Sequence, residues 1–322
     1  MKRRVLVIGV DSFSMDLILK WREYLPNLNR MIEQGTYGYM RSTVPPFTPP
    51  AWTAILTGKN PGKTGIFDWI TYPQRKDEKI RVVYSYDIKA ETVFDILSKN
   101  GKKVVSLNVP LTYPPWKVNG YMVSGIPTPV KENAVITYPE SLKDELDEIV
   151  SGYQIQPMVN LQIKGKEEEY IEEFSKTLVK RFEAALYLLH MIDWDLFFLV
   201  FFAIDSVQHY FWHHMDENHP LHNPNNKYKD VIKNFYIQID SLIGKILSEI
   251  PENTYTFVIS DHGMGPLYGY FLVNEFLLRY GFFKVKNHSY EVKEVQLKVG
   301  GVFLPVLKEN KIVLDRVVYM TE

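Results

Sequence analysis

Short apolar runs that do not alternate with polar residues recur along the chain. The four clearest runs are Val5–Val10, Val104–Val109, Leu196–Phe202 and Tyr255–Ser260. Runs of this length, rich in Val, Ile, Leu and Phe, are typical of strands that are buried on both faces of a parallel sheet. We therefore predict a strand at each of these four runs.

Between these runs, apolar positions recur at helical spacing. Pro26–Gln34 and Glu91–Asn100 are each followed by a glycine, which is suited to the end of a helix. Further amphipathic segments lie at Pro139–Ile149, Lys166–Met191 and Lys227–Ile250. The alternation of strands and helices predicts an α/β fold, with a doubly wound and mostly parallel sheet that carries helices on both faces.

The chain has the length of one large domain. Its 322 residues are enough to bury an extensive α/β core. The stretch rich in Pro and Lys from about 127 to 166 is predicted to project from that core as an inserted segment. The core itself then consists of about 1–126 and 167–290, within a single domain that spans 1–322.

Composition and charge narrow the class of protein. A hydrophobic content of 46% with 23% charged residues is that of an ordinary soluble protein. A net charge of −1 gives no reason to expect binding to nucleic acid or to an anionic membrane. The apolar run before Asp11 is too short for a signal peptide, and no stretch reaches the roughly 18 apolar residues of a spanning helix. We predict a cytoplasmic protein without a membrane partner.

The chain contains no cysteine. Disulfides, thiolate zinc sites and cysteine nucleophiles are therefore excluded. Any metal ion must be bound by histidine and carboxylate side chains.

Acidic residues and histidines follow three of the predicted strands. Asp11, Asp205 and Asp261-His262 each stand just beyond the end of one apolar run. In open α/β sheets, ligands bind beyond the carboxyl ends of the strands, so we expect these side chains to meet at one edge. An Asp in this position is often only a helix cap or a turn residue. Three of them together with histidines favour a metal site.

Asp205 is followed by a histidine at a spacing that suits a helix. His209 comes four residues later, so the two side chains share one helix face and can bind one ion. His213 and His214 continue this row and are rival ligands.

Thr48 is the candidate nucleophile. It precedes Pro49 at the start of a short predicted helix that ends at Gly58, which is also the arrangement of an ordinary N-cap threonine. A helix N-terminus offers partial positive charge to a phosphate and to an alkoxide. A neighbouring metal ion would lower the pKa of the hydroxyl group further.

Together these motifs resemble the alkaline phosphatase superfamily, and within it the type I phosphodiesterase/nucleotide pyrophosphatase branch. The resemblance extends from residue 1 to about residue 280. Its most specific string is Ser-Asp-His-Gly-Met. The matching residues are Asp11, Thr48 with Thr57-Gly58, Asp205 with His209, and Ser260 through Met264.

The resemblance implies metal-dependent hydrolysis of phosphodiesters or nucleotide pyrophosphates. Thr48 would attack phosphorus and form a phosphothreonine intermediate. Two divalent ions are implied, for which zinc suits the nitrogen and oxygen ligands and manganese is the chief rival. The implied ligands are Asp11, Thr48, Asp261 and His262 for one ion, and Asp205, His209 and a further histidine near the family's C-terminus for the other.

The segment after the nucleophile departs from the family pattern. No Asn stands between Pro49 and Gly58, although many members use one to bind a phosphate oxygen. Pro49 and Pro50 have no N–H, so we expect the first backbone donor of the helix at Ala51. This departure counts against a nucleotide substrate in particular.

The C-terminal part also departs from the pattern. The last histidine is His288, and nothing after it resembles the closing histidine motif of the family. We therefore expect the region that completes the second metal site to be missing, unless His213, His214 or His288 replaces it. We also expect a homodimer formed by residues after about Leu277, where Lys311–Tyr319 is strand-like.

Several other functions remain open within the resemblance. A phosphomonoesterase, a phosphonate hydrolase and a phosphoglycerate mutase would share the fold, whereas the sulfatase string Cys/Ser-x-Pro-x-Arg is absent. A non-catalytic metal- or phosphate-binding protein is the alternative from another class, because the second metal site is incomplete. For each of these enzymes, the expected substrate is a small phosphate ester or phosphonate.

Overall fold

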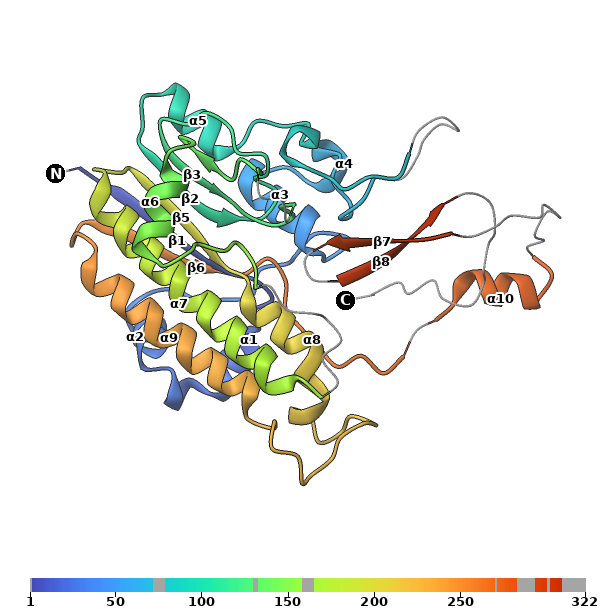
Figure 1. The fold of residues 1–322 in the computed structure, drawn as a ribbon. Coiled ribbons are helices and arrows are strands. Elements are labelled where there is room, and N and C mark those ends of the chain that lie inside the picture. Colours follow the sequence, from blue (N-terminus) through green and yellow to red (C-terminus); the bar gives the residue numbers. More distant parts are fainter. Residues whose placement is uncertain are drawn as a thin grey trace.

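The structure is a computed structural model that describes residues 2–71, 79–129, 133–157, 165–269, 271–282, 293–299 and 302–308. A six-stranded sheet lies at its centre, in the order β4-β3-β2-β5-β1-β6 (Figure 1). The strands of this sheet are β1 (Arg4–Val10), β2 (Val104–Val109), β3 (Gly120–Ser124), β4 (Thr137–Tyr138), β5 (Leu196–Phe201) and β6 (Thr254–Ile259).

All neighbouring strands of the sheet are parallel except β4, which is antiparallel to β3. Strand β1 lies between β5 and β6, with Val5 opposite both Leu196 and Tyr255. The four predicted strands are each found within one residue of the predicted ends, and the predicted α/β class is confirmed. The short strands β3 and β4 were not predicted.

Helices cover both faces of the sheet (Figure 1). On one face lie α1 (Met15–Lys20), α2 (Pro26–Gln34), α6 (Leu142–Ile149), α7 (Glu167–Met191), α8 (Ala203–Met215) and α9 (Val231–Glu249). On the other lie α3 (Thr48–Thr57) and α5 (Val93–Lys99), with α4 (Pro61–Thr64) beside α3. Two short 3₁₀ helices, η1 (Arg22–Tyr24) and η2 (Ser85–Asp87), complete this part of the chain.

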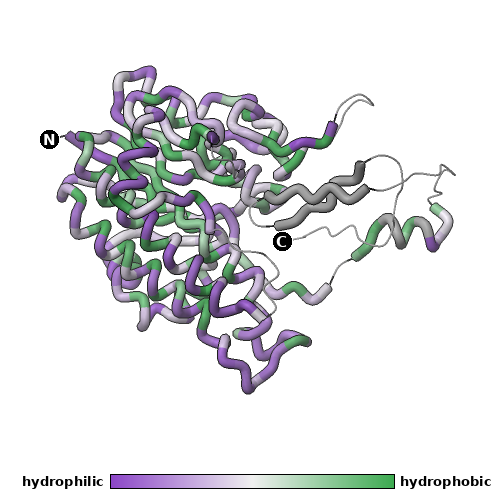
Figure 2. The backbone as a smooth tube through the Cα atoms, viewed as in Figure 1, coloured by the Kyte–Doolittle hydropathy of each residue, from purple (hydrophilic) through white to green (hydrophobic). Residues whose placement is uncertain are grey.

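Strand β5 shows why its apolar run does not alternate. Phe197 and Phe201 face the large core under α7, α8 and α9, whereas Phe198 and Val200 face the smaller core that contains Trp52 of α3. Both faces of the strand are therefore buried, and both must be apolar. Figure 2 shows the apolar residues concentrated along the central strands, with hydrophilic residues on the outer turns of the helices.

The segment 127–166 was expected to project from the core. Its described part, 133–157, instead adds β4 to the sheet and buries Leu142 and Leu146 of α6 in the large core. The four-residue spacing of these leucines gives α6 one apolar face, which packs best against other apolar residues. The wider division of the chain into core and insert stays a prediction.

A buried arginine of α7 fixes this segment to the sheet. Arg181 is 2% exposed, and it donates hydrogen bonds to Asn108 Oδ1 at 2.9 Å and to the Val200 carbonyl at 3.1 Å. A third hydrogen bond joins its guanidinium group to the Ile155 carbonyl. Burial lowers the pKa of Arg181. The carboxyl ends of β2 and β5 are thereby held together with residues 153–157.

Strand β6 forms one edge of the sheet. Among the described residues it pairs only with β1, and Tyr255 and Phe257 on its outer positions are 55% and 52% exposed. The other described elements are α10 (Val273–Arg279) and the antiparallel pair β7 (Lys293–Val299) and β8 (Val302–Lys308). His288 and the predicted strand Lys311–Tyr319 lie outside the described residues. In the part of the chain that is described, no helix has both the length and the apolar character needed to cross a membrane.

Candidate functional site

The predicted acidic residues meet at the carboxyl edge of the sheet. Asp11 directly follows β1, Asp205 lies in the first turn of α8 after β5, and Asp261 with His262 follows β6. Because β5, β1 and β6 are parallel neighbours, their ends bring these residues together. All four side chains are buried. The structure therefore assembles the residues that the sequence singled out from three distant segments.

Asp11, Asp261 and His262 form one compact group. Each offers a ligand atom, and these atoms lie within 4.8 Å of one another. His262 Nε2 is 3.6 Å from Asp11 Oδ1 and 3.3 Å from Asp261 Oδ2. Within the described ranges this is the only group of three or more His, Asp or Glu with such spacing.

The hydroxyl group of Thr48 faces this group. Thr48 Oγ1 lies 3.1 Å from His262 Nε2, and the residue is 3% exposed. We expected Thr48 to cap its helix, but it is the first residue of α3, and Phe47 is the cap with extended backbone angles. Among the described residues, the hydrogen-bond contact of the Thr48 hydroxyl is with His262 of the acidic group.

The start of α3 offers little backbone hydrogen bonding to a phosphate. Pro49 and Pro50 have no N–H. The Ala51 N–H, which we expected to be available, donates to the Phe47 carbonyl at 3.0 Å. The remaining amide at the helix start is that of Thr48 itself.

His262 is oriented by its own backbone segment. Its Nδ1 lies 2.9 Å from the Gly263 carbonyl oxygen. A carbonyl only accepts hydrogen bonds, so Nδ1 carries a proton, and in the neutral ring the lone pair is on Nε2. That lone pair faces Thr48 and the two carboxylates. Histidines that bind metal ions have this arrangement, with one nitrogen donating to a carbonyl and the other bound to the metal.

The electrostatics of the group fit a cation. Burial, followed by the charges of Asp261 and Asp205, raises the pKa of Asp11 well above its usual value. Burial is also the main cause that raises the pKa of Asp261. Asp11 Oδ1, Asp205 Oδ1 and Asp261 Oδ2 are buried without a hydrogen-bond partner among the described residues. Buried carboxylates in this state are stabilised by a bound divalent ion, and this donor set suits one.

Asp205 and His209 form a second, adjacent pair. They lie one turn apart on α8, with His209 Nε2 3.5 Å from Asp205 Oδ1. Burial opposes ionisation of Asp205, but the nearby charge of His209 lowers the pKa of this carboxyl below its usual value. The charge of Asp205 in turn raises the pKa of Asp11 and of Asp261, so the two groups are close neighbours.

The rival histidines lie further along α8. The rings of His213 and His214 are 4.0 Å apart between centroids, and that of His213 is 5.9 Å from His219. Neither joins Asp205 and His209 in a group of three with ligand spacing, as far as the described residues go. His288 lies outside these residues.

Comparison with known families identifies the chain. The sequence matches the family described as type I phosphodiesterase/nucleotide pyrophosphatase over residues 5–317. The chain belongs to this family. The type I phosphodiesterase/nucleotide pyrophosphatase branch that the motifs predicted is thereby confirmed. The comparison with curated proteins found none that matches the sequence.

Solved structures show the same fold. Phosphonoacetate hydrolase from Sinorhizobium meliloti 1021 is similar with a TM-score of 0.60 in complexes with phosphonoacetate and with phosphonoformate, at 17% and 18% identity. The similarity covers 87% of this chain and 62% of the hydrolase, so the chain spans less than two thirds of that protein. Murine ectonucleotide pyrophosphatase/phosphodiesterase 5 has a TM-score of 0.47 at 16% identity, with 81% and 57% covered. The alkaline-phosphatase-like fold is confirmed.

Two residues next to the site were not predicted from the sequence. The Trp52 indole Nε1 donates to Asp11 Oδ2 at 2.8 Å, and the Ser42 hydroxyl donates to the Asp261 carbonyl at 2.6 Å. Gly9 leaves room for the indole, because a Cβ atom there would lie 2.4 Å from Trp52 Cη2. Trp52 follows Thr48 by four residues, which places both on one face of α3. In the sequence, this four-residue spacing was the one indication that Trp52 lies near the site.

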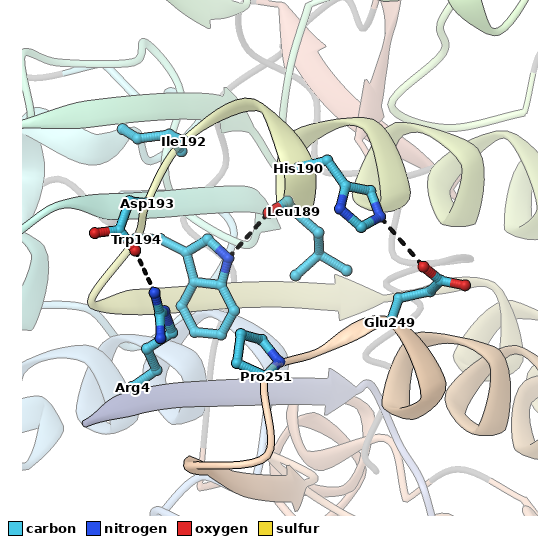
Figure 3. Close-up of a pocket in the computed structure, with 8 residues that line it drawn as sticks. All are labelled: Arg4, Leu189, His190, Ile192, Asp193, Trp194, Glu249 and Pro251. Atoms are coloured by element: carbon cyan, nitrogen blue, oxygen red, sulfur yellow. Dashed lines mark hydrogen bonds and ion pairs between the residues drawn. The ribbon is translucent and has the colours of Figure 1, made fainter. Parts of the chain in front are cut away.

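Two cavities border the sheet at opposite ends. The first, of about 620 Å³, lies beside α3, and Arg41, Ser42 and Lys59 are among its lining residues. The second, of about 270 Å³, lies where β1 and β5 begin, and Figure 3 shows its lining residues. In that second cavity Arg4 pairs with Asp193, and His190 pairs with Glu249. Its charges are thus compensated, and it lies at the other end of the strands from Asp11.

Proposed function

We propose that the chain hydrolyses phosphate esters with Thr48 as the nucleophile. The observation that carries this proposal is the 3.1 Å contact between Thr48 Oγ1 and His262 Nε2, at a buried group that also contains Asp11 and Asp261. An ordinary capping threonine would bond its own helix, whereas Thr48 faces the acidic group. Family membership supports the same chemistry.

The residues of the chain would have the following roles in the reaction. The Thr48 hydroxyl would lose its proton to solvent, and its oxygen would attack phosphorus as the bond to the leaving alkoxide breaks and the alkoxide takes up a proton. Water would then cleave the bond between Thr48 and phosphorus, which restores the hydroxyl and releases phosphate, or a phosphate monoester when the substrate is a diester. Trp52 holds Asp11, and the Gly263 carbonyl holds His262, so that the side chains around Thr48 are preorganised. Asp11, Asp261, His262, Asp205 and His209 would hold the divalent ions, whose positive charge would lower the pKa of the Thr48 hydroxyl.

Zinc is the ion that we propose, with manganese as its rival. The donors are carboxylate oxygens and imidazole nitrogens, and no cysteine competes for them. The pair Asp205 and His209 offers fewer ligands than the other group within the described residues. The proposal therefore includes one tightly bound ion and one weakly bound ion.

A phosphonate hydrolase is the second candidate. The fold likeness to phosphonoacetate hydrolase supports it, at a TM-score of 0.60. For either activity, the cavity beside α3 can accept the part of the substrate that leaves. Arg41 and Lys59 give that cavity a positive character.

The nucleophile is tested by substitution at Thr48. We expect Thr48→Ala to lower turnover of bis-p-nitrophenyl phosphate by about a thousandfold or more while the fold is kept, because loss of a nucleophile removes the covalent route. Thr48→Ser should keep part of the activity. Thr57→Ala is the matched control, since the Thr57 hydroxyl lies at the other end of α3, where it donates to the Thr53 carbonyl and accepts from the Lys59 N–H.

Turnover of Thr48→Ala within about tenfold of the parent would contradict the proposal. Parallel assays with p-nitrophenyl phosphate and phosphonoacetate, each with zinc and with manganese, separate diesterase, monoesterase and phosphonate hydrolase activity. No turnover of any of the three by the parent chain would favour the non-catalytic alternative.

A further inference from the structure

Ser12 has an unusual backbone conformation for its residue type. It directly follows Asp11, its φ is +60°, and it is fully buried. A residue with a Cβ atom is strained in this left-handed region, whereas glycine adopts it freely. A strained non-glycine residue beside a functional site suggests that its side chain has a role there.

Both the backbone and the side chain of Ser12 contact the site. Its N–H donates to Asp261 Oδ1 at 3.2 Å. Its hydroxyl donates to the Gly263 carbonyl at 3.3 Å, which is the carbonyl that orients the His262 ring. These contacts connect Ser12 to the group formed by Asp11, Asp261 and His262.

Ser12 also contacts the helix that carries the second group. Asp205 and His209 lie one turn apart on α8, and Gln208 of the same turn donates to the Ser12 carbonyl. Ser12 thus contacts Asp261 through its amide and the α8 turn of Asp205 through its carbonyl. Asp261 and Asp205 belong to the two separate ion sites of the proposed function.

A buried network holds Ser12 in place. The Ser12 carbonyl accepts a hydrogen bond from Gln208 Nε2 at 2.8 Å. Gln208 Oε1 accepts one from the Tyr236 hydroxyl at 3.2 Å, and the Tyr236 oxygen accepts one from the Ser14 N–H at 3.0 Å. Gln208 lies on α8 between Asp205 and His209, and Tyr236 lies on α9. The turn after β1 is therefore fixed from two helices by groups that are themselves satisfied.

We propose that Ser12 is a positioning residue that holds the two metal-binding groups at a fixed spacing. Its amide fixes Asp261, its hydroxyl donates to the Gly263 carbonyl that orients His262, and its carbonyl binds Gln208 on the helix turn that carries Asp205 and His209. The inference rests on the proposed function, because it requires that these groups bind ions. Residues that orient metal ligands in this way change metal affinity by about 10- to 100-fold when they are removed.

The experiment compares zinc affinity in Ser12→Gly and Ser12→Ala by competition with a chelator. Both substitutions delete the hydroxyl, but only glycine relieves the strained φ. We expect zinc affinity to fall about tenfold or more in both variants. The melting temperature of the metal-free protein should stay the same or rise in Ser12→Gly, and it should fall in Ser12→Ala, which keeps the strained φ. Ser106→Ala is the control, because Ser106 is also fully buried, lies in β2 and makes no side-chain hydrogen bond among the described residues.

The outcomes test the positioning role of Ser12 separately from the proposed function. Zinc affinity of Ser12→Gly equal to that of the parent overturns the positioning role and leaves the proposed function intact. A parent chain that binds neither zinc nor manganese overturns the proposed function itself. If Ser12→Gly does not fold, Tyr236→Phe makes the same test, since its hydroxyl reaches the site only through Gln208 and Ser14. Unchanged zinc affinity in that variant also overturns the inference.

Discussion

At the scale of single residues, the hydrogen bond from Trp52 to Asp11 has a measurable consequence. Burial and the charges of Asp261 and Asp205 raise the pKa of Asp11, and the Trp52 N–H opposes this rise. Trp52→Phe removes the donor and should raise the pKa further, so that protons compete better with metal ions. We expect zinc affinity to fall about tenfold near neutral pH, and the deficit to shrink as the pH is raised.

Trp116→Phe is the matched control for this substitution. The Trp116 Nε1 also donates to a carboxylate at 2.8 Å, but that carboxylate belongs to Asp95 on α5. Both variants therefore lose an indole N–H that donates to a carboxylate, but only Trp52→Phe loses one at the proposed metal site. Equal zinc affinity in the two variants at every pH would show that Trp52 does not influence metal binding.

The raised pKa values of Asp11 and Asp261 predict how stability depends on pH. Both carboxyls bind protons more tightly in the folded state than in the unfolded state, where the pKa is about 4. The stability that these two carboxyls contribute is fully present below the unfolded-state pKa. It is lost as the pH rises through their raised folded-state pKa values, by up to about 1.4 kcal/mol for each pH unit and each carboxyl. Because the pKa of Asp205 is lowered, its own contribution to stability changes only below about pH 4 and does not offset this loss.

We therefore expect the melting temperature of the metal-free protein to fall as the pH rises above about 4. Added zinc should remove most of this fall, because the ion binds the deprotonated carboxylates. Asp11→Asn should reduce the slope, since one titrating group is lost. Identical slopes with and without zinc would argue against a metal site at this group.

At the scale of elements, the seating of α3 on β1 depends on Gly9. A Cβ atom at Gly9 would lie 2.4 Å from Trp52 Cη2 and 2.9 Å from Val200 Cγ2. Gly9→Ala should therefore displace α3 and the nucleophile at its start. We expect a loss of about 1–3 kcal/mol in the free energy of unfolding, measured with urea, together with reduced turnover.

Gly38→Ala serves as the control for this effect. An added Cβ atom at Gly38 meets no atom within 4 Å, so the substitution tests only the change in backbone entropy. If both variants unfold at the same urea concentration, close packing of Trp52 against β1 is not what positions α3.

At the scale of the whole molecule, the edge of the sheet at β6 bears on the oligomeric state. Tyr255 and Phe257 are more than half exposed there, and the described residues provide no second partner for the strand. Exposed strand edges and apolar patches favour association. The homodimer through residues after about Leu277 stays a prediction, with a twofold axis as its simplest symmetry, and the exposed edge adds β6 as a further contact that we expect.

Sedimentation across a dilution series measures this association. We expect the mean mass to fall toward that of one chain on dilution, and Phe257→Lys to shift the equilibrium toward the monomer. Lys245→Ala, a change at an exposed lysine of α9, should leave it unaltered. A single mass of one chain at all concentrations would exclude association at this edge.

The sequence predicted the parts of the site that follow strands, because the end of a buried strand is visible as the end of an apolar run. Asp11 and His262 were found in this way. Ser12, Trp52 and Gln208 were not, since their contacts depend on backbone angles and on segments that are distant along the chain. No pattern of residue types records that an indole reaches a carboxylate in another element.

The fold shows the same division between what is local and what is not. The four long apolar runs predicted β1, β2, β5 and β6. Strands β3 and β4 were missed because β3 begins at Gly120 and β4 contains only Thr137 and Tyr138. Pairing with a neighbouring strand, rather than their own composition, makes these residues strands.

The position of β1 between β5 and β6 has a consequence for biosynthesis. β1 leaves the ribosome well before its hydrogen-bonding partners, Leu196–Phe201 and Thr254–Ile259, are made. Sheets built from such distant pairs fold slowly and leave apolar strands exposed in the meantime. The growing chain already carries Thr48 while it still lacks Asp261 and His262. The buried group around Thr48 is therefore assembled only after β6 and the residues that follow it have been made.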